Sequence, residues 1–164
     1  MSIRDKIVSL DVLCGMLQAA RADGRTVVLA NGIFDLLHVG HVRYLQEAKR
    51  EGDVLVVGIN SNTSANQLKG SGRPVLDERG RAELVAALEV VDRVVIFNEL
   101  NVEALLEAIR PDVHAKGTDY SVDTVPERAT AARLGIRVAI VGDPKHHSTS
   151  ALFAGIRRPA HPSQ

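Results

Sequence analysis

Two closely spaced histidines are the residues of this sequence best placed to do chemistry. His38 and His41 lie three residues apart, around Gly40, in the stretch Asn-Gly-Ile-Phe-Asp-Leu-Leu-His-Val-Gly-His. Because three residues is nearly one helical turn, both imidazoles can face the same side of a helix that begins here. They could donate hydrogen bonds to phosphate oxygens, while Gly40 lets a ligand approach the backbone and N–H groups near Ile33 and Phe34 cradle a neighbouring phosphate. This pattern predicts a nucleoside triphosphate site without a P-loop.

Two other interpretations of the histidines stay open. One histidine could pack in the core while the other caps the helix. A zinc site would need further ligands, for which Asp35, Asp143, His146 and His147 are available, but neither an HExxH spacing nor a cysteine pair supports it. The adjacent side chains of His146 and His147 diverge, which favours a loop beside the phosphate site.

Strands and helices alternate along the chain. An apolar strand at 27–29 precedes the histidine loop, a helix over 39–49 follows it, and a second buried strand comes at 54–59. This order predicts one doubly wound, Rossmann-like α/β domain with a mainly parallel five-stranded sheet, covering residues 1–157. Its first helix lies within 1–24, and 158–164 form a frayed tail. Further strands are predicted at 94–97, 113–116 and 136–141, helices over 9–23, 77–88, 102–109, 126–134 and 148–156, and a polar stretch at 60–69.

The composition limits the classes of partner. Twenty basic and twenty acidic residues give a formal net charge of zero, which disfavours broad electrostatic binding of nucleic acid or of an anionic membrane. Aromatic residues make up 3% of the chain, with no tryptophan, so stacking platforms for single-stranded nucleic acid are few. Any anion site must therefore be built locally. The single cysteine, Cys14, and the absence of a long apolar run or cleavable leader predict a cytoplasmic protein.

Several motifs together resemble one known family. The residues from Gly32 to His41 are similar to the signature of the nucleotidyltransferase superfamily of cytidylyltransferase type, in which an HxGH motif binds the nucleotide phosphates. From about Lys6 to Ile156, the chain most resembles the bacterial heptose-1-phosphate adenylyltransferases. Matching motifs stand, in order, at 68–70 and 73–75, at Arg81, and at 87–89, 91–92, 116–120 and 148–150.

The sequence departs from that family at two positions. Relatives tend to carry an aspartate in place of Asn62, and many carry a lysine or arginine in place of Phe153. The second departure removes a phosphate contact, which either Arg157 or Lys145 could supply.

The resemblance implies a reaction. A nucleoside monophosphate would pass from a nucleoside triphosphate, ATP in these relatives, to a sugar 1-phosphate such as D-glycero-D-manno-heptose 1-phosphate. The products would be a nucleotide-sugar such as ADP-heptose and pyrophosphate. Magnesium would arrive with the triphosphate, held mostly by phosphate oxygens and water, and a homodimer is expected. The alternatives are a CTP-dependent glycerol-3-phosphate cytidylyltransferase and a catalytically inactive nucleotide-binding regulatory module.

The resemblance also implies roles for particular residues. His38, His41 and Lys69 are the expected catalytic donors, and Asp35 and Arg81 are expected to bind the acceptor substrate. Each has a structural alternative, such as a helix cap for Asp35 or a surface ion pair with Asp77 or Glu78 for Arg81. The nucleotide is expected to contact Ile33, Phe34, Gly40, Lys116, Asp119, Ser148, Thr149 and Ser150.

Overall fold

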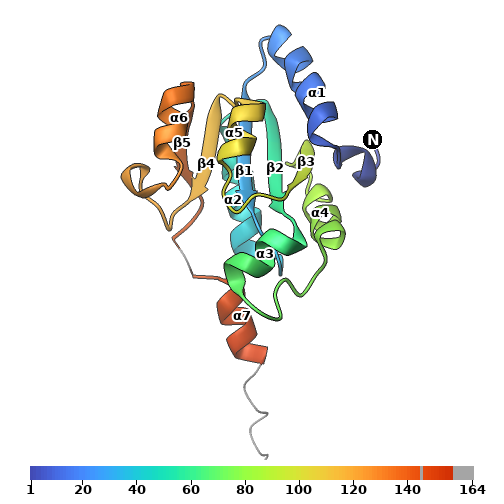
Figure 1. The fold of residues 1–164 in the computed structure, drawn as a ribbon, viewed down its shortest axis with the longest axis vertical. Coiled ribbons are helices and arrows are strands. Elements are labelled where there is room, and N and C mark those ends of the chain that lie inside the picture. The colour runs from blue at the N-terminus through green and yellow to red at the C-terminus, as the bar shows by residue number, and fades with distance from the viewer. Residues whose placement is uncertain (145, 157–164) are drawn as a thin grey trace, which may run out of the picture.

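The computed structural model describes residues 1–144 and 146–156, which form a five-stranded sheet with helices on both faces (Figure 1). Lys145, Arg157 and the tail predicted at 158–164 lie outside the described residues. The strands are β1 (Val27–Gly32), β2 (Val54–Asn60), β3 (Arg93–Phe97), β4 (Val113–Gly117) and β5 (Arg137–Val141). The helices are α1 (Leu10–Ala22), α2 (Val39–Arg50), α3 (Asn62–Lys69), α4 (Glu78–Ala86), α5 (Glu103–Ile109), α6 (Arg128–Leu134) and α7 (Thr149–Ile156), with short 3-10 turns at Ile3–Lys6 and Val122–Thr124.

The strand order is β3-β2-β1-β4-β5, and each neighbouring pair is parallel. The predicted doubly wound α/β fold is therefore confirmed, and the described sheet is parallel throughout. The chain builds outward from β1 in both directions, so the order reverses between β1 and β4. In such sheets, the crevice at the carboxyl ends of these two strands is where ligands bind.

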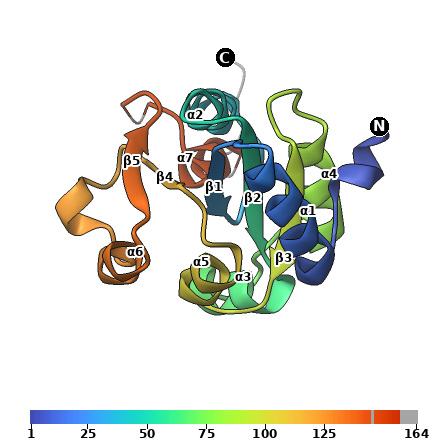
Figure 2. The ribbon, with the colours of Figure 1, turned by 90° about the horizontal axis from the view of Figure 1, so that it is seen from above.

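Two apolar cores cover the two faces of the sheet. In β1, Val28 and Ala30 face a core shared with α2 and α4, whereas Val27 and Leu29 face a core shared with α1, α5 and α6. The side chains alternate because successive strand residues point to opposite faces. Figure 2 shows α2 and α5 on opposite sides of the sheet. The continuous apolar strands of the sequence are thus buried on both faces, as expected for a parallel sheet.

The polar stretch predicted at 60–69, for which the sequence indicated no helix, mostly forms α3. Ser61 caps this helix, with its hydroxyl accepting a hydrogen bond from the Ser64 N–H at 3.2 Å. Only Ser64 and Ala65 of the helix are buried, so no apolar stripe marks it in the sequence. The other predicted helices and strands are present, and their ends differ by at most two residues, except that β1 runs to Gly32, three residues beyond the predicted strand at 27–29.

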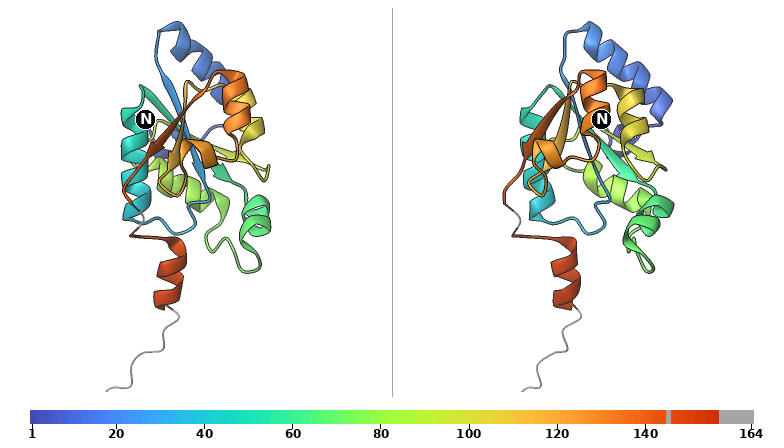
Figure 3. Two further views of the ribbon diagram at one scale, coloured as in Figure 1. Left: turned by 90° about the vertical axis from the view of Figure 1, so that its left-hand side faces the viewer. Right: turned by 60° about the vertical axis from the view of Figure 1, so that its left-hand side comes forward.

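The last described helix, α7, projects beyond one end of the sheet (Figures 1 and 3). It carries no fully buried residue, in contrast to α1, α2 and α4, which contribute to the cores. Within the described residues, no helix combines the length and the apolar character needed to cross a membrane.

We predict opposite effects of adding one methyl group at two glycines. A Cβ on Gly52 would lie 2.9 Å from the Thr26 carbonyl oxygen and 2.7 Å from a Val28 methyl group. Gly52→Ala should therefore lower the free energy of unfolding by about 1–3 kcal/mol. A Cβ on Gly15, in α1, meets nothing within 4 Å, so Gly15→Ala should raise it by about 0.5–1 kcal/mol. Urea unfolding measures both, and equal effects would contradict the prediction.

Candidate active site

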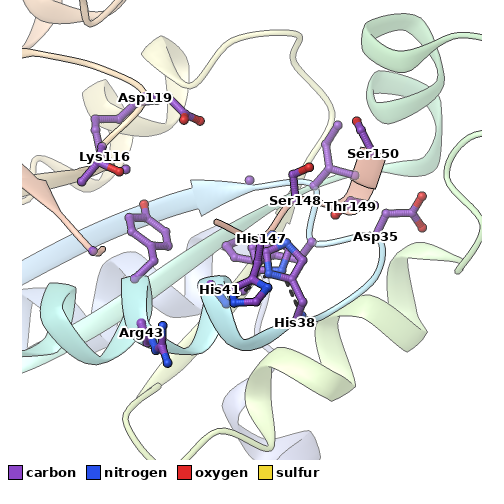
Figure 4. Close-up of a pocket in the computed structure, with 18 of the residues that line it drawn as sticks. Asp35, His38, His41, Arg43, Lys116, Asp119, His147, Ser148, Thr149 and Ser150 are labelled. Atoms are coloured by element: carbon purple, nitrogen blue, oxygen red, sulfur yellow. Dashed lines mark hydrogen bonds between the residues drawn. The ribbon is translucent and has the colours of Figure 1, made fainter. Parts of the chain in front are cut away.

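A cavity of about 510 Å³ opens at the carboxyl edge of the sheet (Figure 4). Residues following β1, β4 and β5 line it, together with the beginning of α2, the end of α3 and the beginning of α7. All the predicted site residues except Arg81 line this cavity. The tertiary structure thus brings together side chains that are more than 100 positions apart in the sequence.

His38 and His41 form a reciprocal cap at the beginning of α2. The Nδ1 atom of His38 accepts a hydrogen bond from the Gly40 N–H at 3.1 Å, and Nδ1 of His41 accepts from the His38 N–H at 3.4 Å. The two rings stack with their centroids 3.8 Å apart. Because a neutral imidazole that accepts at Nδ1 carries its hydrogen on Nε2, the backbone sets both histidines as Nε2 donors. Each histidine can therefore cap the helix through Nδ1 and donate a hydrogen bond to a phosphate through Nε2.

The residues around the histidine pair hold it in place. The Phe34 ring lies 5.1 Å from the His41 ring, and Phe34 itself has a φ of 51°, in the left-handed region that side chains rarely adopt. A Cβ on Gly40 would lie 2.9 Å from Cε1 of His38. The position of the His38 ring therefore favours glycine here, and the predicted close approach of a ligand to Gly40, which lines the cavity, stays a prediction.

Asp35 holds the loop after α3 rather than presenting a vacant carboxylate to the cavity. Its Oδ1 accepts from the N–H groups of Val75 and Leu76 at 2.8 and 3.0 Å, and its Oδ2 accepts from Nε of Arg73 at 2.7 Å. Burial alone would raise the pKa of Asp35, but these hydrogen bonds and the Arg73 charge outweigh it and lower the pKa. Asp35 therefore stays ionised as the anchor of Arg73, and its predicted contact with the acceptor stays a prediction.

Arg81 is fully buried and does not reach the cavity, which corrects its prediction as a substrate-binding residue. Its Nη1 donates to the carbonyl oxygens of Ile33 and Asn60 at 2.7 and 2.8 Å, and Nε donates to the Leu76 carbonyl at 3.0 Å. Nη2 donates to Oδ1 of Asn62 at 3.1 Å. The guanidinium thus connects the loop after β1, the end of β2, α3 and the segment before α4, and it fixes the backbone at Ile33 from behind.

The far end of the cavity contains a buried lysine. Nζ of Lys116 lies 3.6 Å from Oε2 of Glu127 and 4.7 Å from the centre of the Tyr120 ring. Burial lowers the pKa of Lys116, and Glu127 opposes that shift. Figure 4 places Lys116 and Asp119 on one side of the histidines, and Asp35 and the beginning of α7 on the other.

The beginning of α7 and the end of α3 supply the other groups that favour anions. The Ser148 hydroxyl accepts from the Ala151 N–H at 3.1 Å and so acts as a helix cap, while Thr149 and Ser150 line the cavity within the first turn. Lys69 is the last residue of α3 and also lines the cavity. A helix N-terminus and a lysine that line the same cavity favour the binding of a phosphate there.

The zinc alternative finds no support in the part of the chain that the structure describes. There, no group of three or more histidine, cysteine, aspartate or glutamate side chains could hold a metal ion. Asp143, one of the predicted ligands, instead pairs with Arg43 at 2.9 Å.

Comparison with known proteins agrees with this arrangement. The family model described as cytidylyltransferase-like matches residues 29–155, the segment that contains the cavity-lining residues. The chain belongs to the cytidylyltransferase-like family. Among curated proteins it is 45% identical, over 92% of its length, to the bifunctional protein HldE of Geobacter sulfurreducens, and 47% identical, over 91%, to that of Methylobacillus flagellatus.

The chain spans about a third of the length of these curated relatives, 31% and 30% respectively. A solved structure from Thermoplasma volcanium, described as a lipopolysaccharide core biosynthesis protein, matches with a TM-score of 0.64 and 35% identity. That match covers 76% of this chain and 100% of the solved one.

Sequence reasoning missed two residues that shape the cavity of this family member. Asn31 lines it, and its Oδ1 lies 3.0 Å from Nε2 of His114, which is fully buried in β4. Tyr44 also lines it and donates its hydroxyl to the Ala115 carbonyl at 2.8 Å, tying α2 to β4. The register of β1 with β4 pairs Leu29 with His114 and so brings Asn31 close to His114. No local sequence motif could have indicated this contact.

We predict that His114 makes stability depend on pH. Burial lowers the pKa of His114 to about 3, from an ordinary value of 6.5. Above pH 6.5, His114 is neutral in both the folded and the unfolded chain, so its contribution to the free energy of unfolding does not change with pH. Below that, only the unfolded chain takes up the proton, and stability should fall by roughly 1.4 kcal/mol per pH unit from this group.

Urea unfolding between pH 7 and pH 5 should show this slope. In His114→Leu, unfolding should take up about one proton fewer, so the slope should be smaller by that amount. An unchanged slope in the variant would contradict the prediction.

Loss of the Arg81 guanidinium should destabilise the fold. Arg81→Met keeps the aliphatic volume but leaves the buried carbonyls of Ile33 and Asn60 without a donor. We expect a loss of about 3 kcal/mol or more in urea unfolding, since each unsatisfied buried group costs about 1–3 kcal/mol. Arg4→Gln, at a surface pair with Glu83, is the matched control and should change stability by less than about 0.5 kcal/mol. Equal stability of the two variants would refute the role given to Arg81.

Proposed function

We propose that this chain is a nucleotidyltransferase that transfers AMP from ATP to D-glycero-D-manno-heptose 1-phosphate, giving ADP-heptose and pyrophosphate. The His38–His41 pair carries the proposal. Both Nδ1 atoms accept backbone N–H groups, so both Nε2 atoms are hydrogen-bond donors in a cavity that also receives a helix N-terminus. Fixed donors of this kind stabilise the charge that builds on phosphate oxygens during transfer.

The reaction needs no nucleophile from the protein. A phosphate oxygen of the sugar 1-phosphate attacks the α-phosphorus of ATP, and the bond from that phosphorus to the oxygen shared with the β-phosphate breaks. Pyrophosphate leaves with the electron pair of that bond. Alignment and charge stabilisation supply most of the catalysis in such transfers. His38 and His41 are the proposed donors to the α- and β-phosphates, and Lys69 adds a positive charge from α3.

The division of the cavity supports separate places for the phosphates and for the nucleoside of the nucleotide. The histidines, Lys69 and the first turn of α7 form its phosphate-binding part, and Lys116 and Asp119 lie at the opposite end (Figure 4). There, the loop after β4 offers polar groups for the nucleoside. Such a place at the carboxyl edge of a parallel sheet is usual for nucleotides.

Magnesium is the cofactor that this arrangement suits. The described carboxylates of the cavity are engaged by the protein, as in the pairs of Asp35 with Arg73 and of Asp143 with Arg43. The donor set therefore fits an ion held by the phosphates of ATP and by water, which is the usual mode for Mg²⁺. When bound, the ion would neutralise charge on the phosphates.

The acceptor follows from the family relationship. The motifs that resemble heptose-1-phosphate adenylyltransferases fall within the segment that aligns with the bifunctional HldE proteins. This similarity supports heptose 1-phosphate as the substrate.

We also propose a homodimer working in the cytoplasm. The family resemblance supports the homodimer. The single cysteine, Cys14, agrees with a reducing compartment such as the cytoplasm. Light scattering after size-exclusion chromatography would test the assembly, for which a mass near twice 17.7 kDa is expected. A single-chain mass would contradict it.

Pyrophosphate release tests the proposed reaction directly. Assays with each of the four nucleoside triphosphates, against heptose 1-phosphate, glycerol 3-phosphate and other phosphorylated acceptors, should give turnover with ATP and heptose 1-phosphate. Turnover confined to CTP and glycerol 3-phosphate would refute the heptose assignment. ATP binding without pyrophosphate release for any acceptor would favour a regulatory module.

His41→Ala should lower the rate of pyrophosphate release by on the order of a hundredfold, because loss of one fixed donor removes about 3 kcal/mol of transition-state stabilisation. Since Nδ1 of His41 also caps α2, urea unfolding must show that the variant is folded. Turnover of the folded variant within threefold of the original would show that His41 is not a catalytic donor.

A further inference from the structure

Arg73, which no motif assigned to a role, is held rigidly at the wall of the cavity. It lies in the loop between α3 and α4, and its side chain is about 20% exposed. Its Nε donates to Oδ2 of Asp35 at 2.7 Å, and Asp35 is nearly fully buried. The backbone N–H groups of Val75 and Leu76 occupy the other oxygen of that carboxylate, so both the loop and the guanidinium are fixed to one anchor.

The guanidinium of Arg73 makes a second contact. Its central carbon lies 4.5 Å from the centre of the Phe153 ring, on α7. Stacking on an aromatic face is a favourable arrangement for arginine. Phe153 stands four residues after Thr149, so it lies one turn along α7 from the end of the helix that faces the cavity. Arg73 is thus held between Asp35 and α7.

The terminal nitrogens of Arg73 are not used by the described residues. A guanidinium has five N–H donors, and only Nε of Arg73 makes a hydrogen bond within the described part of the chain. Two other cations of the cavity pair with carboxylates through a terminal nitrogen. Arg43 pairs through Nη1 with Asp143 at 2.9 Å, and Lys116 lies 3.6 Å from Glu127. Arg73 therefore keeps its paired Nη1 and Nη2 donors available, in the fork that matches two oxygens of a phosphate.

We propose that Arg73 binds the terminal phosphates of the nucleotide, and so the departing pyrophosphate, with Asp35 and Phe153 acting as positioning residues. The proposal rests on the function proposed above and assigns a residue to its phosphate subsite. Arg73 lies four residues after Lys69 and packs on α7, the helix whose first turn favours anions. Asp35, which anchors Arg73, lies on the other side of the histidines from Lys116 and Asp119 (Figure 4). Pyrophosphate is therefore the ligand that this fork fits.

Titration with inorganic pyrophosphate and magnesium tests the proposal without any acceptor substrate. Arg73→Gln should weaken pyrophosphate binding and raise the KM for ATP by about tenfold or more, the effect of losing hydrogen bonds to a charged group. The KM for heptose 1-phosphate should stay within about twofold. Arg73→Lys should recover only part of the loss, because an ammonium lacks the fork.

Two further variants test whether the orientation of Arg73 matters and whether the loss of any arginine has the same effect. Phe153→Leu keeps an apolar side chain but removes the aromatic face, so it should weaken pyrophosphate binding by a few fold while Arg73 itself is intact. Arg133→Gln makes the same charge change at an exposed pair with Glu107 on the outside of the fold, and it should leave pyrophosphate binding unchanged. Urea unfolding of each variant establishes that it is folded.

The outcomes distinguish this proposal from the proposed function. A rise in the KM for heptose 1-phosphate alone would show that Arg73 contacts the acceptor, and unchanged constants in folded Arg73→Gln and Arg73→Lys would show a structural role only. Either result overturns the proposal, as does failure of the original protein to bind pyrophosphate. If the protein binds pyrophosphate through Arg73 but turns over no acceptor, the proposed function fails and the phosphate subsite stands.

Discussion

The buried guanidinium of Arg81 is the interaction on which the geometry of the site depends. It donates to the carbonyls of Ile33, Asn60 and Leu76 and to the side chain of Asn62, so four segments meet at one cation. A charge without exposure is stable only where every donor finds an acceptor. The loop after β1, the end of β2, the beginning of α3 and the segment before α4 are therefore constrained together.

Hydrogen bonds with the backbone also orient the side chains at the surface of the cavity. His38 and His41 use one nitrogen each to cap α2, which sets the tautomer of both rings. Asp35 accepts hydrogen bonds from Arg73 and from two backbone N–H groups, and so it orients the arginine at the wall of the cavity. In both cases, a residue that could have contacted substrate through one atom is oriented by the backbone through another. Preorganisation of this kind lowers the reorganisation needed when a triphosphate binds.

Local signals made much of the fold predictable. Apolar strands, helix caps such as Ser9 and Asp77, and the HxGH spacing each depend on residues close in sequence, so the alternation of strands and helices could be predicted. Helix α3 was missed because its polar residues give no apolar stripe. Arg81 was misassigned because a charged residue in an amphipathic helix is usually exposed, and burial depends on acceptors from three other segments.

The sequence by itself determined the fold class, the family and the position of the histidine pair, because these follow from periodicity and from motifs of a few residues. The tertiary structure alone decided which charged groups face the ligand. Arg73 and Arg81 stand eight positions apart in one chain segment, yet one lines the cavity and the other is enclosed. The partners that separate them, Asp35 and Phe153 for the first and the carbonyls behind β1 and β2 for the second, are brought near only by the folded sheet. The residue type determines the charge, but residues that are distant in sequence determine whether that charge faces the cavity or is buried.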